Sequence, residues 1–169
     1  IKTIAHDDFG NVLAGSDGKG VWQYRKTVKD SLIFTGDTMV TMRIDTLQIP
    51  KIEHTIYSEE SGFPSDWIRQ LVPIRNTLWV ATYSAGIVKM SYDITQNKYL
   101  KTDHFAIETG IEDLLIRDSK LDEEGRLWYS TQNGHLGFIK NDQVTHLGDV
   151  LEAGVAINSI EFYKGNLFL

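Results

Sequence analysis

Short apolar runs recur along the chain, and turn residues such as Gly, Asp and Asn separate them. Three runs resemble one another and a fourth begins in the same way; they cover residues 11–16, 77–82, 126–131 and 166–169. The stretch Leu78-Trp79-Val80-Ala81 is apolar at consecutive positions, so a strand made from it is apolar on both faces. Such continuous apolar character is typical of a strand buried on both sides. The pattern predicts strands that lie between neighbouring sheets.

The spacing of these runs predicts the architecture. Aligned on Leu13, Trp79, Trp128 and Phe168, they are separated by 66, 49 and 40 residues. A repeat of about 40–50 residues made of short strands is the period of a β-propeller blade. We predict an all-β fold: a partial β-propeller of about three four-stranded antiparallel blades plus the start of a fourth. The four aligned side chains should wedge between blades; a sugar-binding platform is the alternative for the tryptophans.

The predicted units form one propeller fragment over residues 1–169. The blades are placed at 1–36, 62–105, 107–149 and, truncated, 155–169, with 37–61 as an insertion or connector. In the first unit, 31–35 is the expected outer strand, and 37–57 should form an additional hairpin or an extended loop. For residues 107–117 a short amphipathic helix is the alternative, but β-branched residues and the repeat register favour a strand, which is predicted at 111–117.

Composition narrows the range of partners. The chain has 169 residues, 41% of them hydrophobic, and a net charge of −6. Its Lys and Arg residues are scattered singly, whereas a nucleic-acid backbone requires a basic cluster, so no nucleic-acid contact is expected. Without cysteine, thiol catalysis and thiolate metal ligands are excluded. Because the first residue is Ile1, and because three units and a stub cannot close a ring, we expect a piece of a longer protein.

No residue pattern predicts catalysis or a cofactor. The five histidines form no pair at i,i+2 or i,i+4, so neither a metal site nor a catalytic triad is expected. The acidic run 118–124 lacks the ligand spacing of a calcium loop and predicts a solvated turn. The Gly-rich segment 15–20 joins two predicted strands, whereas a phosphate-binding loop precedes a helix. Glu59, Glu60 and Glu108 give no indication of a shared site.

Propellers bind ligands at the mouth of the central channel, near the loops that flank the innermost strands. The residues expected there are Trp67, Arg69, Tyr83, Gln132 and His135. Aromatic rings together with guanidinium and amide groups suit stacking on a sugar ring and hydrogen bonding to it. His135 stands where the repeat has Gly, so it is expected to face the propeller surface or to serve only as a turn residue. A purely structural role is the alternative for each of these residues.

Three motifs carry a family resemblance. The second unit contains Gly62-Phe63-Pro64-Ser65-Asp66-Trp67-Ile68 and then Leu78-Trp79-Val80-Ala81-Thr82. The third contains Asp122-Glu123-Glu124-Gly125-Arg126-Leu127-Trp128, and the first contains Asp7-Asp8-Phe9-Gly10-Asn11-Val12-Leu13. These stretches resemble the two-component regulator propeller repeat, and the resemblance covers most of the chain outside 37–57. The chain departs from the family pattern at Leu13, Ala81 and Ser130, and the second unit lacks the Asp-x-x-Gly turn.

The resemblance implies a function that composition and spacing do not show. Such repeats occur in the periplasmic region of hybrid two-component histidine kinases, which sense products of glycan breakdown. It therefore implies an extracytoplasmic sensor segment that binds a carbohydrate, contacts further blades and downstream domains of its own chain, and belongs to a homodimeric, membrane-anchored receptor. The alternatives are a propeller lyase or lactonase and a purely structural interaction propeller. The equivalent inner positions hold Gly20, Gly86 and His135, which disfavours an enzyme.

Overall fold

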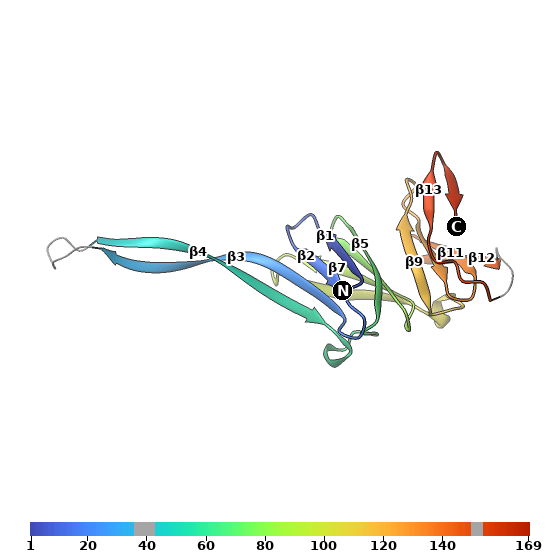
Figure 1. Cartoon of the computed structure of the whole chain (residues 1–169), viewed down its shortest axis with the longest axis horizontal. Coiled ribbons are helices and arrows are strands. Elements are labelled where there is room, and N and C mark those ends of the chain that lie inside the picture. The colour runs from blue at the N-terminus through green and yellow to red at the C-terminus, as the bar shows by residue number, and fades with distance from the viewer. Residues whose placement is uncertain (36–42, 150–153) are drawn as a thin grey trace.

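The computed structural model describes residues 1–35, 43–149 and 154–169, and strands dominate them (Figure 1). These residues form four antiparallel sheets, three of four strands and one of two. Within each sheet, strands that are consecutive in the chain are neighbours, so the all-β prediction is confirmed. Two single 3-10 turns, η1 (Glu59–Ser61) and η2 (Ile107–Thr109), interrupt the strands. None of the described helices has the length and hydropathy needed to span a bilayer.

The first sheet consists of β1 (Thr3–His6), β2 (Val12–Gly15), β3 (Val21–Thr35) and β4 (Arg43–Tyr57). The last two strands form a long hairpin that extends well beyond the other sheets (Figure 1). The predicted outer strand at 31–35 is therefore wrong, because this segment is the far end of β3. The outer strand is β4, which lies in the segment 37–61 that was expected to be an insertion or connector; residues 37–42 of that segment lie outside the described residues. β3 contains neither Gly nor Pro, and it continues through Asp30, which pairs with Gln48 of β4.

The four strands of the second sheet all lie within the predicted second unit, 62–105. The sheet consists of β5 (Ile68–Ile74), β6 (Thr77–Thr82), β7 (Ile87–Asp93) and β8 (Lys98–Phe105).

The third sheet begins later than the strand predicted at 111–117, and a two-stranded hairpin follows it. They consist of β9 (Ile116–Leu121), β10 (Leu127–Thr131), β11 (His135–Lys140), β12 (Gln143–Asp149), β13 (Glu161–Tyr163) and β14 (Asn166–Phe168). The strand predicted at 111–117 starts only at Ile116, because hydrogen bonds to Asp113 hold the preceding residues in a loop. There the Asp113 carboxylate accepts hydrogen bonds from the backbone N–H groups of Leu115 and Asn133, at 3.0 and 3.1 Å.

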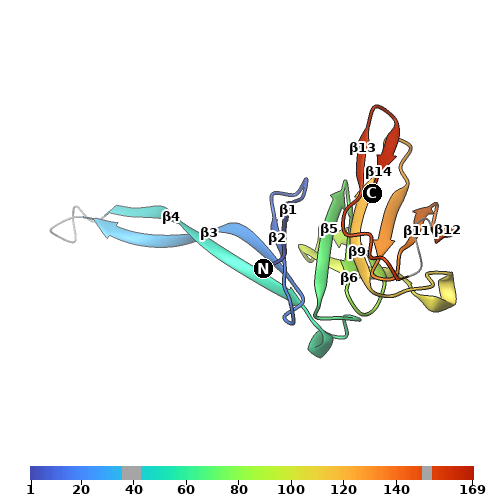
Figure 2. The ribbon, with the colours of Figure 1, turned by 45° about the vertical axis from the view of Figure 1, so that its right-hand side comes forward.

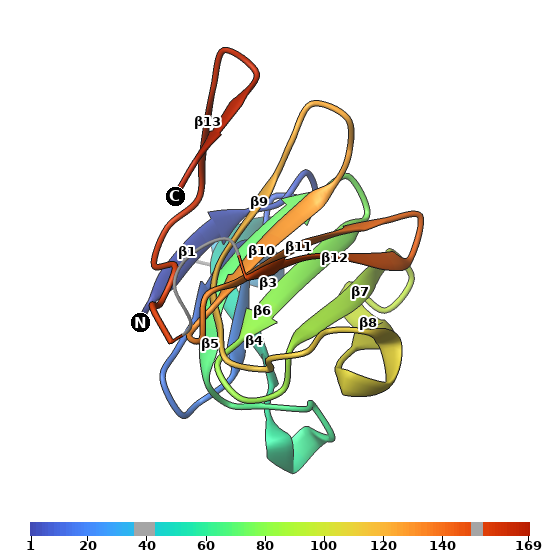
Figure 3. The same ribbon diagram turned by 90° about the vertical axis from the view of Figure 1, so that its right-hand side faces the viewer.

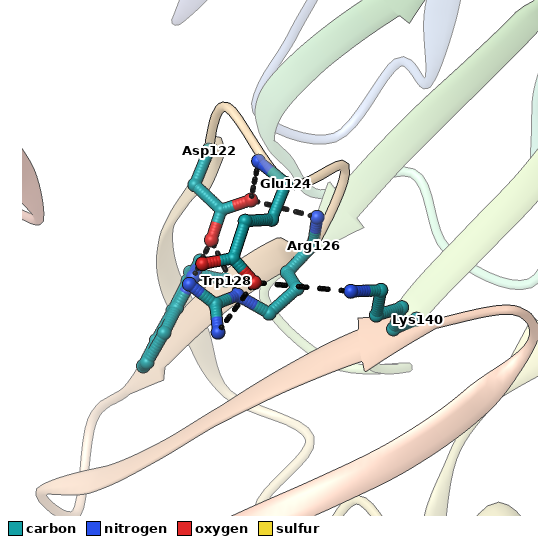
Figure 4. Close-up of polar contacts among 5 residues, drawn as sticks. All are labelled: Asp122, Glu124, Arg126, Trp128 and Lys140. Carbon is teal, nitrogen blue, oxygen red and sulfur yellow. Dashed lines mark hydrogen bonds and ion pairs between the residues drawn. The ribbon is translucent and has the colours of Figure 1, made fainter.

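The turn before β10 is organised around one aspartate (Figure 4). The Asp122 carboxylate accepts hydrogen bonds from the backbone N–H groups of Glu124 and Arg126, at 2.9 Å each. The Trp128 indole donates to the same carboxylate at 2.8 Å, and the Arg126 guanidinium at 2.5 Å. The Glu124 carboxylate forms an ion pair with Arg126. The Lys140 ammonium lies 3.8 Å from the same Glu124 carboxylate. The Asp122 carboxylate thus joins the turn to the indole ring.

The turn before β2 repeats this arrangement, which gives the Asp-x-x-Gly motif a physical basis. The Asp7 carboxylate accepts hydrogen bonds from the backbone N–H groups of Phe9 and Asn11, at 3.0 and 2.8 Å. Gly10 adopts a φ of 81°, a left-handed conformation that favours glycine. The second unit lacks the motif, and its turn between β5 and β6 instead places Arg75 at a φ of 53°.

Apolar side chains fill the spaces between successive sheets, and Figure 3 looks along this row of sheets. The first cluster joins the first and second sheets and includes Leu13 and Val80. The second cluster joins the second and third sheets and includes Phe105 and Tyr129. The third cluster joins the third sheet to the segment around the last hairpin and includes Ile160. The middle strands of the second and third sheets therefore have apolar clusters on both faces, as the continuous apolar sequence of residues 78–81 predicts, whereas the first sheet has such a cluster on one face.

The aligned repeat positions face the sheet that follows them in the chain. Leu13 lies in the first cluster, Trp79 packs against the second, and Trp128 belongs to the third. Phe168 occupies the equivalent position in the last hairpin but is 53% exposed, because no sheet among the described residues covers it. The neighbouring Leu167 points back and packs against the third cluster. Phe168 is thus not a buried wedge in the described part of the chain.

Candidate functional site

The first strands of the three large sheets lie next to one another (Figure 2). Arg69 is the second residue of β5, and Arg117 is the second residue of β9. Both arginines follow a fully buried isoleucine, Ile68 or Ile116, which anchors the strand in the core. Because side chains alternate along a strand, burial of the isoleucine turns the next side chain away from that core. The two guanidinium groups therefore come from neighbouring sheets.

Both guanidinium groups lie near the ring of Tyr83, which follows β6. The Cζ atom of Arg69 is 4.1 Å from the ring centroid, and that of Arg117 is 5.7 Å from it. A cation within about 6 Å of an aromatic centroid is attracted by the ring face. The Tyr83 hydroxyl also donates a long hydrogen bond, 3.5 Å, to the side-chain carbonyl of Gln132. We call Arg69, Tyr83, Arg117 and Gln132 the arginine–tyrosine cluster.

The cluster has more positive than negative charge. Asp17 lies 4.0 Å from a terminal nitrogen of Arg69 but only 2.9 Å from the Lys2 ammonium. Among the described residues, no carboxylate lies within ion-pairing distance of Arg117. The Nε atoms of both arginines are buried and have no hydrogen-bond partner in the described structure. Buried donors without partners are energetically costly, so an acceptor-rich ligand would be favoured at this position.

Three of the five predicted ligand residues meet in this cluster: Arg69, Tyr83 and Gln132. Trp67 joins it only through its backbone, since its carbonyl accepts a hydrogen bond from the Tyr83 N–H at 2.8 Å. Its indole is 48% exposed and lies over the Gly18 turn of the first sheet, where a Cβ on Gly18 would be 3.9 Å from the ring. Trp67 therefore presents an open aromatic surface beside the cluster.

The fifth predicted residue, His135, has a different set of neighbours. Its Nδ1 atom lies 3.8 Å from a carboxylate oxygen of Glu112, and the same oxygen lies 3.4 Å from Nε2 of His146. The two imidazole rings are 5.4 Å apart between centroids. The spacing of the histidines along the chain predicts no metal site, yet the fold brings two of them and a carboxylate together.

Arg117 is a cluster member that sequence reasoning missed. A signal for it exists, because Ile68-Arg69 and Ile116-Arg117 are the same dipeptide at the start of equivalent strands. The tryptophans that stand out in the sequence lie in the second strands, whereas the first strands share only this dipeptide. The arrangement of the cluster suits recognition of anionic or hydroxyl-rich molecules, since guanidinium groups donate paired hydrogen bonds to planar oxyanions.

Comparison with known proteins identifies a shared fold. The chain is similar to the extracellular domain described as belonging to the hybrid two-component system BT3049 of B. thetaiotaomicron, with a TM-score of 0.62 and 18% identity. It is also similar to the corresponding domain described for BT4673 of the same organism, with a TM-score of 0.52 and 19% identity.

These alignments cover 97% and 99% of this chain but only 19% and 26% of the two neighbours. The chain therefore corresponds in fold to about a fifth to a quarter of those extracellular domains, and neither is described as an enzyme. No protein-family model matches the sequence, and no curated protein matches it.

Proposed function

We propose that the chain is a segment of a β-propeller in the extracytoplasmic, periplasmic part of a hybrid two-component sensor. Three four-stranded meanders that stack in chain order are the expected form of propeller blades. The fold similarity to extracellular domains described for two such systems supports the same assignment. In this proposal the segment is non-catalytic, and a histidine kinase, a membrane anchor and a homodimer interface belong to the longer parent protein.

Within this role, we propose that the arginine–tyrosine cluster binds an acidic oligosaccharide. The observation that carries this proposal is the meeting of Arg69 and Arg117, from two sheets, at one tyrosine ring. A uronate carboxylate would accept hydrogen bonds from the guanidinium groups, and the exposed ring of Trp67 could stack on a neighbouring sugar. Because the two arginines come from different sheets, a bound ligand would favour one packing of those sheets over another. Such a shift in packing would signal that the binding site is occupied.

Isothermal titration calorimetry with the purified chain tests the ligand class. The probes are a uronic-acid disaccharide and the neutral disaccharide cellobiose. We expect the acidic sugar to bind better, and we expect Arg69→Met or Arg117→Met to weaken that binding by about 10- to 100-fold, the loss expected for a charged hydrogen bond. Arg25→Met is the matched control, since Arg25 pairs with Glu53 on the long hairpin. Equal binding of the two sugars, or unchanged affinity in both variants, would refute the proposed ligand.

A further inference from the structure

Glu112, His135 and His146 form a cluster of potential metal ligands on the third sheet. Each contributes one ligand atom, and the three atoms all lie within 4.8 Å of one another. Glu112 comes from the loop between η2 and β9, His135 begins β11, and His146 lies in β12. This group shares no residue with the arginine–tyrosine cluster and lies outside the function proposed above.

The backbone explains why the two histidines face the same space. His146 pairs with Gly137, and the register between β11 and β12 shifts between His135 and Gly137. This irregularity brings the two rings to a tilted arrangement with centroids 5.4 Å apart. The loop then places Glu112 within reach of both rings. Three sequence-distant side chains thus converge through strand pairing.

The distances are close to those that a tetrahedral zinc ion requires. Ligand atoms about 2 Å from a tetrahedral metal lie about 3.3 Å from one another. The Glu112 oxygen is 3.4 Å from the nitrogen of His146 and 3.8 Å from that of His135, so only small rotations are needed. The histidine side chains are 21% and 23% exposed and that of Glu112 is 57% exposed, so a fourth ligand could come from solvent.

A buried tyrosine provides a second, independent observation. Tyr129 is 1% exposed, and its hydroxyl has no hydrogen-bond partner in the described structure. The hydroxyl lies beneath Gly137, the strand partner of His146: a Cβ on Gly137 would be only 2.4 Å from it. A metal-bound water is a suitable partner for such a hydroxyl.

We propose that Glu112, His135 and His146 bind one Zn²⁺ ion, with water as the fourth ligand. Two imidazoles and one carboxylate with an open position are a common protein ligand set for zinc. The ion would connect the loop before β9 to β11 and to the outer strand β12. Without a metal, the same residues form only a charge pair between a carboxylate and two imidazoles, which is the alternative that the experiment must separate from a zinc site.

Equilibrium dialysis of the chelator-treated chain against zinc chloride tests the site directly. We expect one zinc ion per chain, and we expect either Glu112→Gln or His146→Gln to weaken zinc binding at least about tenfold. Glu108→Gln and His6→Gln are matched controls, because both residues are exposed and lie outside the cluster. Zinc should also raise the melting temperature of the wild-type chain but not of the two ligand variants.

Cobalt substitution gives a readout that a charge pair cannot produce. Co²⁺ in the site should show the visible absorption of a low-coordinate metal, and this absorption should disappear in His146→Gln. No zinc binding, or zinc binding that both ligand variants retain at wild-type affinity, would overturn the proposal. A ligand variant that does not fold would be replaced by His135→Gln in the same assays.

Discussion

At the residue scale, Asp122 shows how one side chain organises a turn and the indole that packs beside it. Burial opposes its ionisation, but hydrogen bonds from the Trp128 indole and from Arg126 outweigh burial and lower the pKa of Asp122. A carboxyl group whose pKa is lower in the folded chain than in the unfolded chain stabilises the fold above its unfolded pKa. That contribution is lost as the pH falls through the folded pKa.

Replacing Asp122 therefore has an effect that depends on pH. We expect Asp122→Ala to lower the free energy of unfolding at neutral pH by about 1–3 kcal/mol, because two backbone N–H groups, the Trp128 indole and the Arg126 guanidinium lose their acceptor. The difference from wild type should shrink below about pH 4, where the carboxyl group begins to take up a proton. Urea unfolding at several pH values measures this, with the exposed neighbour Glu123→Gln as control. A difference that stays constant down to pH 2 would contradict the assignment.

At the element scale, the burial of the same repeat position depends on whether another sheet follows it in the chain. Trp128 is 8% exposed and contacts Phe138 and Phe162, with ring centroids 5.2 and 5.9 Å away. Phe168 is 53% exposed on the last hairpin. We therefore expect the side chain at this position to stabilise the fold through packing between sheets. Strand propensity does not distinguish the two positions, because it is similar for Trp and Phe.

A pair of substitutions separates these contributions. We expect Trp128→Ala to lower the free energy of unfolding by about 3–5 kcal/mol, because it leaves a cavity between the third sheet and the segment around the last hairpin. Phe168→Ala should cost less than about 1 kcal/mol, since the ring is largely exposed. Thermal and urea unfolding monitored by circular dichroism measure both effects. Similar losses for the two variants would show that Phe168 is buried against another surface.

At the scale of the whole molecule, the first sheet has one covered and one uncovered face. Leu13 and Val21 face the first apolar cluster, whereas Ile4, Trp22 and Ile56 are in register on the opposite face. Ile4 is 62% exposed and Ile56 is 36% exposed. Together with the aromatic ring of Trp22, these side chains form a contiguous apolar surface, and such surfaces promote association.

We therefore expect the chain to self-associate in dilute solution, which sedimentation velocity at increasing concentration would detect. The double variant Ile4→Lys and Ile56→Lys should shift the population towards monomer, because it charges the uncovered face. Ile94→Lys is the matched control, since Ile94 is 70% exposed in the turn between β7 and β8. A wild-type chain that is monomeric at every concentration would contradict this expectation.

The sequence by itself determined the strand content and much of the sheet order. Apolar periodicity and turn residues such as Gly10 and Gly125 act locally, so they can be recognised without the fold. The first sheet was assigned less well, because β3 continues past its expected end through Asp30 and Ser31, and β4 pairs along all of it. Which of two apolar segments becomes the outer strand depends on long-range pairing, and no local pattern encodes that choice.

Only the tertiary structure decided which polar side chains meet. Arg69, Tyr83 and Gln132 were expected near a common site, but the contribution of Arg117 depends on β5 and β9 lying side by side. The approach of Glu112 to His146 likewise depends on a register shift between two strands and on the path of one loop. Periodicity specifies which face of a strand is buried, whereas the contacts between distant polar groups follow from how the sheets stack.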